Sequence, residues 1–200
     1  MLEITLTTLA KALTPLITTL TTECAGIIKE QRQKWEAKSS TKKLSKIILN
    51  INTVKTMWSR EKGILINEFY YPSRITSRYS SSPSVEPETL IFTNTIIEGI
   101  VGQGKSILMR QLCNSAVENS IIPVFIELRM ISSERSLSSL ITDFLDAAGI
   151  HGGSQIFNHL AEKNRIVLIL DGFDEIPTKL ISNTIYQISQ LHKVHDELKL

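Results

Sequence analysis

Apolar side chains recur every three or four residues through the first part of the chain. Steps that alternate between four and three residues predict an amphipathic helix with an apolar seam close to a heptad repeat. Pro15 lies inside this pattern, and because proline has no N–H group we expect it to kink the helix or divide it in two. The seam consists of Leu2, Leu6, Leu9, Leu13, Leu16, Leu20 and Ile27.

A second helical pattern follows a short polar stretch. Residues 38–41 (KSST) predict a turn with a helix-capping residue. The helical spacing then continues to Trp58, with apolar positions at Leu44, Ile47, Ile48, Ile51, Val54, Met57 and Trp58. Two seams joined by a polar turn predict an antiparallel helical hairpin, which we assign to a helical N-terminal domain, residues 1–62. It is either a structural cap on the next domain or a module that oligomerises or recruits partners.

Residues 63–89 are expected to link this domain to the rest of the chain. The segment FYYPSR (69–74) is aromatic and basic, and residues 77–84 are rich in serine and proline, as in a surface loop. We expect the linker to dock on the neighbouring sheet. The alternative is a wall for a nucleotide base, with Arg74 or Arg78 near the phosphates.

Residues 90–200 alternate between strand and helix patterns. Residues 121–128 predict a buried strand, and the continuous apolar run at 165–170 predicts a central parallel strand covered on both faces. Helices are expected at 136–148 and 154–163. An apolar run from Leu90 to Ile97 predicts a further strand. The fold class is therefore α/β, a three-layer core around a parallel sheet, preceded by the α-helical domain.

Charge is uneven along a chain of ordinary globular composition. Residues 1–62 hold 11 Lys and Arg against 5 Asp and Glu, a net charge of +6, and the remainder holds 11 against 15, a net charge of −4. The basic part is either a contact for a membrane surface or nucleic acid or, as we expect, a solvated helical face. Cys24 and Cys113 are too isolated for a disulfide framework and are expected to be buried, reduced thiols. With no basic leader and no uninterrupted span, the sequence predicts a cytoplasmic protein.

Residues 99–106 (GIVGQGKS) match the phosphate-loop pattern G-x-x-x-x-G-K-[S/T] between a predicted strand and a predicted helix. Glycines allow the backbone to wrap around phosphate, and the start of a helix favours negative charge. Lys105 is expected to reach the β- and γ-phosphates, and the Ser106 hydroxyl to bind Mg²⁺. The phosphate-binding candidates are Gly99, Ile100, Val101, Gly102, Gln103, Gly104, Lys105 and Ser106.

An acidic cluster, DGFDE (171–175), follows the last apolar strand. Acids at the carboxyl end of such a strand form the second half of an NTPase site, the Walker B motif. Asp171 is expected to hold Mg²⁺ opposite Ser106. Either Glu175 or Asp174 would orient the attacking water and accept its proton.

These motifs together resemble the NACHT family of signal-transducing P-loop NTPases. The phosphate loop is followed by ILMRQL, PVFIELR and LILDGFDE, and the DGFDE form distinguishes NACHT from the plainer AAA+ Walker B. The upstream helices and the FYYPSRI segment look like those of bacterial NACHT proteins. The resemblance covers about residues 64–192.

The resemblance implies a STAND-class switch with ATP, ADP and Mg²⁺ as cofactors, residues 90–200 being a partial NACHT domain. Such proteins hold ADP when closed, exchange it for ATP after a trigger and oligomerise to activate an effector, and bacterial members act in antiphage defence. No sensor arginine, winged-helix histidine or repeat sensor follows the Walker B helix. We therefore expect a fragment or a truncated product that binds nucleotide but in which hydrolysis is doubtful. The alternatives are a non-catalytic helical interaction module on a nucleotide-binding platform and an unrelated phosphate-loop kinase or motor ATPase.

Overall fold

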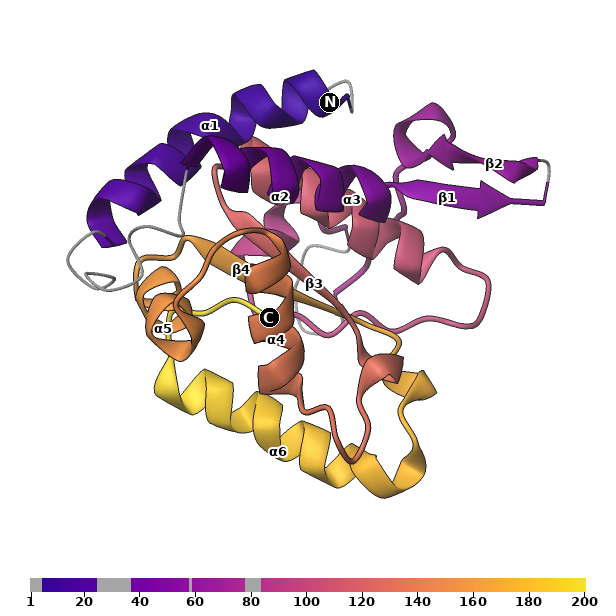
Figure 1. Ribbon diagram of the computed structural model, residues 1–200. Coiled ribbons are helices and arrows are strands. Elements are labelled where there is room, and N and C mark those ends of the chain that lie inside the picture. Colours follow the sequence, from indigo (N-terminus) through magenta and orange to yellow (C-terminus); the bar gives the residue numbers. More distant parts are fainter. Residues whose placement is uncertain (1–4, 25–36, 58, 78–83) are drawn as a thin grey trace.

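A small parallel sheet forms the centre of the structure, a computed structural model that describes residues 5–24, 37–57, 59–77 and 84–200. Its strands, β3 (Ile122–Glu127) and β4 (Ile166–Asp171), form where the apolar runs predict them (Figure 1). They pair in register, so that Glu127 lies opposite Asp171 at the carboxyl ends. Lys199 adds a single parallel bridge to β4 at Val167, close to the end of the sequence.

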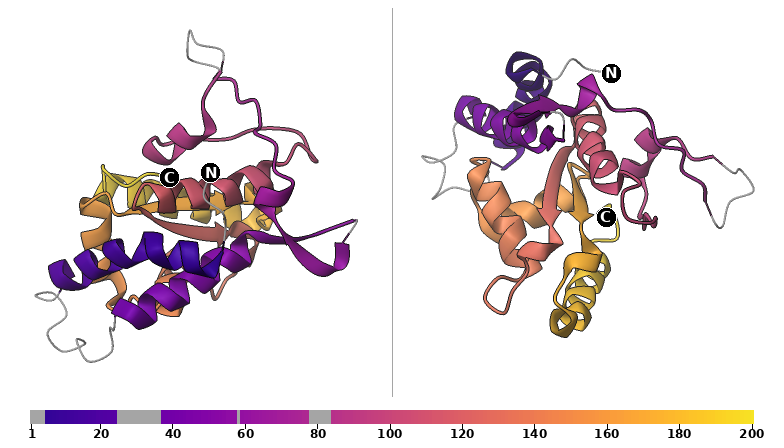
Figure 2. Two further views of the ribbon diagram at one scale, coloured as in Figure 1. Left: turned by 90° about the horizontal axis from the view of Figure 1, so that it is seen from above. Right: turned by 90° about the vertical axis from the view of Figure 1, so that its right-hand side faces the viewer.

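Helices cover both faces of this sheet and give it three layers. Alternate side chains of a strand point to opposite faces, and those of β3 and β4 belong to two separate apolar clusters. One face packs against α3 (Lys105–Glu118), and the other against α4 (Leu137–Ala147) and α5 (Gly153–Glu162). The last helix, α6 (Thr178–Val194), packs against α4 at the outer edge of this layer (Figures 1 and 2). The predicted α/β layering is therefore present around a sheet of two strands.

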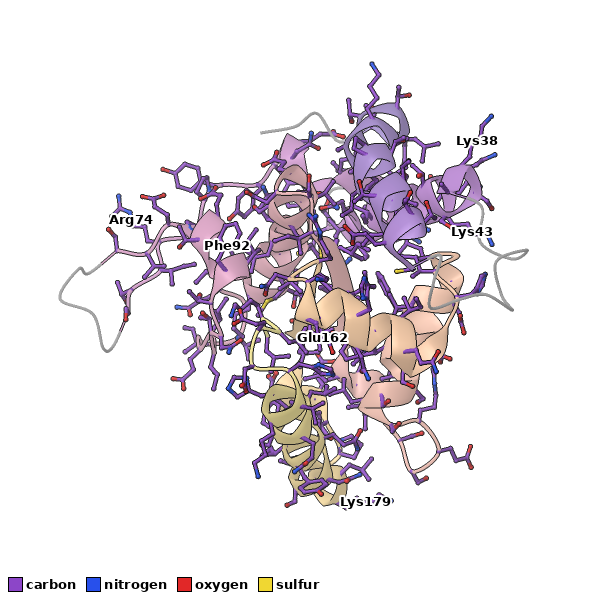
Figure 3. All side chains as sticks on the ribbon, turned by 90° about the vertical axis from the view of Figure 1, so that its left-hand side faces the viewer. Lys38, Lys43, Arg74, Phe92, Glu162 and Lys179 are labelled. Atoms are coloured by element: carbon purple, nitrogen blue, oxygen red, sulfur yellow. The ribbon has the colours of Figure 1, made fainter. Side chains whose placement is uncertain are left out.

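The N-terminal helices also contribute to this core. α1 (Leu6–Glu23) and α2 (Ala37–Ile51) lie side by side and run in opposite directions (Figure 1). Lys38 and Lys43 of α2 point away from the body of the molecule (Figure 3). The apolar faces of both helices join the cluster on the α4 side of the sheet. Their buried members are Leu9, Leu13, Leu16, Ile17, Leu20, Leu44 and Ile48.

Pro15 does not divide the first helix, contrary to one of the two outcomes that the sequence suggests. The helix runs through it from Leu6 to Glu23. Both Pro15 and Lys11, whose carbonyl loses its partner, lie on the exposed side. Water can therefore satisfy that carbonyl, which lowers the cost of proline inside a helix.

The second helix starts and ends earlier than its sequence pattern predicts. The expected turn at residues 38–41 is wrong, because these residues are already helical. Ser40 is buried and donates to the Gly149 carbonyl at 2.8 Å, so a tertiary contact outweighs its preference for a cap.

The predicted continuation of this helix to Trp58 is also wrong. At Asn52 the side-chain amide donates to the Ile48 carbonyl at 2.9 Å, and the helix ends. The chain then forms an antiparallel hairpin of β1 (Thr53–Thr56) and β2 (Ser59–Leu65), which projects from the body (Figure 1). β-Branched residues favour the extended backbone here. Trp58 itself lies outside the described residues.

The strand predicted before the phosphate loop is not formed. Residues Pro87–Phe92 make a 3₁₀ helix, η4, with proline at its start. The following segment makes one backbone hydrogen bond to a distant part of the chain, from the Thr95 N–H to the Leu200 carbonyl at 3.1 Å. Ile96 is 89% exposed. A strand needs a neighbouring strand, and among the described residues no strand forms a β-ladder with residues 96–99.

The linker docks through a few apolar residues. Ile75 and Val85 form an antiparallel bridge and pack, partly buried, on the α3 side of the core. Arg74 is exposed, and Arg78 lies outside the described residues.

Candidate nucleotide-binding site

The phosphate loop enters α3 through two glycines in left-handed conformations. Gly102 has φ of 86° and Gly104, the N-cap of α3, has φ of 81°. Residues other than glycine rarely adopt these backbone angles. Among the residues that the structure describes, no side chain caps this helix start. The N–H groups of its first turn are therefore directed toward the position where an anion would bind.

Lys105 and Gln103 fold back over the loop. The Lys105 ammonium donates to the carbonyls of Gly99 at 2.6 Å and Ile100 at 3.1 Å. The Gln103 side chain accepts from the Ile100 N–H at 2.9 Å. A methyl group on Gly99 would lie 2.5 Å from Gln103 Oε1, so a larger residue at this position would displace the Gln103 side chain from the closed loop. Val101, also expected to bind phosphate, is 90% exposed and makes no described contact to another site residue.

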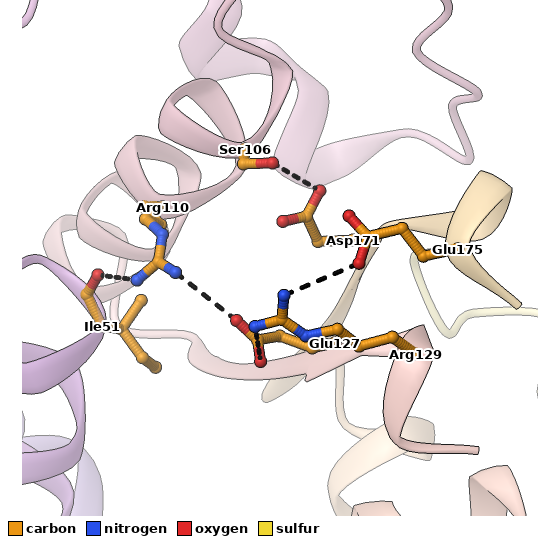
Figure 4. Close-up of polar contacts among 7 residues, drawn as sticks. All are labelled: Ile51, Ser106, Arg110, Glu127, Arg129, Asp171 and Glu175. Carbon is orange, nitrogen blue, oxygen red and sulfur yellow. Dashed lines mark hydrogen bonds and ion pairs between the residues drawn. The ribbon is translucent and has the colours of Figure 1, made fainter. Parts of the chain in front are cut away.

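Ser106 and Asp171 meet across the space between α3 and β4. The Ser106 hydroxyl donates to Asp171 Oδ1 at 3.1 Å (Figure 4). One residue is the second of α3 and the other is the last of β4, so the parallel strand carries the acid to the start of the helix. A hydroxyl and a carboxylate oxygen are ligands that suit Mg²⁺, which commonly binds one or two protein oxygens together with substrate phosphates. The two residues therefore fit the expected metal site.

The two candidate water-orienting acids have different surroundings. Asp174 and Glu175 both lie in a 3₁₀ turn, η6 (Phe173–Glu175), which follows Gly172 in a left-handed conformation with φ of 77°. Glu175 forms an ion pair of 3.6 Å with Arg129. Asp174 is exposed, and in the described parts of the chain it has no ion pair or side-chain hydrogen bond.

Three charged residues that the sequence analysis gave no role complete this edge of the sheet. Glu127 ends β3 and contacts both Arg129, at 2.8 Å, and Arg110 of α3, at 3.5 Å (Figure 4). The pKa of the Arg129 guanidinium is raised above its usual value, first by the hydrogen bond to Glu127 and then by the charges of Glu127 and Glu175. The sequence did contain one indication of a role for Glu127, because this residue lies at the carboxyl end of a predicted strand.

Other features of the structure lie apart from the loop. A cavity of about 400 Å³ lies between α4, α5 and α6, and another of about 440 Å³ lies beside Phe125 and Arg110. Within the described ranges, no helix is both long and apolar enough to cross a membrane.

Comparison with known protein families places residues 93–198 of the chain in a family. The family model described as the NACHT domain matches residues 93–198, which include the phosphate loop, both strands and the acidic turn. No curated protein and no solved structure matches the chain significantly.

Proposed function

Because the chain belongs to the NACHT family, whose members are nucleotide-binding signalling NTPases, we propose that it acts as an ATP-dependent switch. The observation that carries the proposal is the contact of 3.1 Å between Ser106 and Asp171. It brings together two residues, far apart in the sequence, that the proposal assigns to the two halves of an NTPase site, beside a helix start that no described side chain caps.

Each residue of the site has a role in this proposal. The loop N–H groups and Lys105 bind the phosphates, and Ser106 and Asp171 hold the metal. Bound Mg²⁺ would neutralise charge on the β- and γ-phosphates. Gly102 and Gly104 adopt left-handed conformations that suit glycine, and because they have no side chains they let the backbone approach the phosphates closely.

Hydrolysis, as proposed, uses Glu175 as the proton acceptor. A water oxygen bonds to the γ-phosphorus while the bond from that phosphorus to the bridging oxygen breaks. The electron pair of the broken bond stays on the ADP oxygen, and the water proton passes to the Glu175 carboxylate. The products are ADP and inorganic phosphate.

The remaining parts of the proposal come from family resemblance. We place the chain among bacterial STAND-class NACHT proteins that act in antiphage defence in the cytoplasm, with ADP holding the closed state and ATP the open one. Self-association and effector or sensor partners belong to the same proposal. The alternative, a non-catalytic helical interaction module, receives less support, because the apolar seam of α1 and α2 packs inside the chain.

Titration with a fluorescent adenine nucleotide in the presence and absence of Mg²⁺ tests the switch. Lys105→Ala should weaken binding roughly 10- to 100-fold, the effect of losing charge-assisted hydrogen bonds worth about 1.5–3 kcal/mol. Glu175→Gln should bind as the wild type does, because its role follows binding. Competition with unlabelled ATP and GTP then identifies the base preference.

The matched control is Lys179→Ala, which removes an exposed lysine at the start of α6 (Figure 3). It should leave the affinity unchanged. Equal affinity of the wild type and Lys105→Ala would show that the loop does not bind phosphate, and the switch proposal would then be wrong.

A further inference from the structure

A row of charged side chains crosses the carboxyl edge of the sheet beside the phosphate loop. It runs from Arg110 on α3 to Glu127 at the end of β3, then to Arg129 and to Glu175 (Figure 4). Positive and negative groups alternate along the row. Only Glu175 belongs to the NTPase motifs.

Arg129 is held more closely by Glu127 than by Glu175. Its shorter contact, 2.8 Å, is with Glu127, and its longer one, 3.6 Å, is with Glu175. The Glu127 side chain is 31% exposed and the Glu175 side chain 54% exposed. The better-buried carboxylate therefore anchors the arginine, and the arginine then restrains the more exposed carboxylate.

Glu127 is itself held in place. Its other oxygen faces Arg110 at 3.5 Å, and Arg110 lies over the Phe125 ring with 5.4 Å to the ring centre. Arg110 also donates a hydrogen bond to the Ile51 carbonyl at the end of α2. Ring packing and the backbone contact restrain Arg110, and Arg110 in turn holds Glu127 at the edge of the sheet.

We propose that Arg129, anchored by Glu127, is a positioning residue that holds Glu175 where it can orient the attacking water. This inference rests on the proposed nucleotide-switch function. It assigns the water-orienting role to Glu175 and not to Asp174, the other acid in the turn, since Arg129 contacts Glu175. Arg129 touches neither water nor phosphate in this role.

A different role for Arg129 would be direct binding of phosphate, and the two roles predict different measurements. A phosphate ligand contributes to the affinity for bound nucleotide. A positioning residue leaves that affinity unchanged and acts only where the attacking water is present. ADP with aluminium fluoride mimics the transition state of γ-phosphoryl transfer, so it reports on the position of Glu175 even without turnover.

The test compares Mg²⁺-dependent affinities for ADP and for ADP with aluminium fluoride in the complete chain. In Arg129→Gln, the affinity for ADP should stay within about twofold of wild type, whereas the gain from aluminium fluoride should fall about 10- to 100-fold. Glu175→Gln should lose the same gain, and the double variant should lose no more than either single variant. Arg129→Lys should restore part of the gain, because it keeps the charge.

Arg135→Gln is the matched control, since Arg135 forms an ion pair of the same 2.8 Å length with Asp143 outside the site. It should behave as wild type in both titrations. The inference is overturned if Arg129→Gln keeps the full gain, if it weakens ADP binding as strongly as it weakens the mimic, or if wild type binds ADP but gains nothing from aluminium fluoride. Absence of ADP binding in wild type would instead overturn the switch itself.

Discussion

Three acidic residues lie within five positions of the chain at residues 171–175, and each has a different partner. Asp171 accepts from Ser106, Glu175 pairs with Arg129, and Asp174 faces solvent. The sequence could identify the cluster but could not show that Glu175, and not Asp174, has a basic partner, because that partner is Arg129. That residue is more than forty positions away in the sequence and reaches the turn only through the parallel pairing of β3 and β4.

Cys113 illustrates a residue whose chemistry is suppressed by its environment. It is fully buried in α3, and burial raises the pKa of its thiol far above the ordinary value of 9.0. Only the thiolate is reactive. The folded chain keeps this proton at a pH where the unfolded chain releases it. The free energy of unfolding is therefore retained below about pH 9 and falls as the pH rises further.

We predict that Cys113 does not react with an aromatic disulfide reagent at pH 8 in the native chain. In a Cys24→Ser background, labelling should be at least about 100-fold slower than in denaturant, since both access and thiolate formation are blocked. The reverse variant, Cys113→Ser, provides the comparison. The pKa of Cys24 is raised to about 11, first by burial and then by Glu23, so this thiol should react faster than Cys113. Rapid labelling of native Cys113 would contradict the packing of α3 on the sheet.

At the scale of elements, α2 is joined to α3 by a pair of buried amides. Asn52 and Asn114 donate to each other at 2.8 and 2.9 Å, and Asn52 also donates to the Ile48 carbonyl. Both side chains are nearly inaccessible to solvent, at 0% and 5% exposed. Removing one partner would therefore leave the other buried without a hydrogen bond.

Asn52→Ala is predicted to lower the free energy of unfolding by about 1–3 kcal/mol. Denaturant titration followed by circular dichroism measures this change. Asn50→Ala, at an exposed position of α2, should change stability by less than about 0.5 kcal/mol. The double variant Asn52→Ala/Asn114→Ala should be less destabilised than the sum of the single variants. Strict additivity would mean that the amides do not act as a pair.

The elements that could be predicted from the sequence are those whose pattern is set locally. The strands at 122–127 and 166–171 are apolar up to the acid that ends each of them, and Ser136 caps α4 by accepting from the Ser139 N–H at 3.1 Å, as its position before the helical pattern suggests. The errors occur where a distant partner decides the structure. Ser40 is helical because it contacts Gly149, and residues 96–99 stay irregular because no described strand pairs with them.

Considered as a whole, the molecule joins its N-terminal helices to the nucleotide-binding layers through one apolar cluster. Leu13 of α1 is completely buried in the cluster that also contains Val124 of β3 and Leu168 of β4. The charge asymmetry along the sequence therefore does not coincide with a separation of cores. A continuous core favours cooperative unfolding of both parts.

Leu13→Ala is accordingly predicted to destabilise the whole described core and not only α1. The expected loss is about 2–5 kcal/mol, the usual cost of a buried leucine-to-alanine change. Native-state hydrogen exchange, read by mass spectrometry, should show the same loss of protection in peptides from α1 and from β4. Leu6→Ala is the matched control, since Leu6 is 38% exposed and its loss should have a much smaller effect. If protection falls in residues 5–24 alone while β4 stays protected, α1 unfolds independently, and stability of the nucleotide site does not depend on the N-terminal helices.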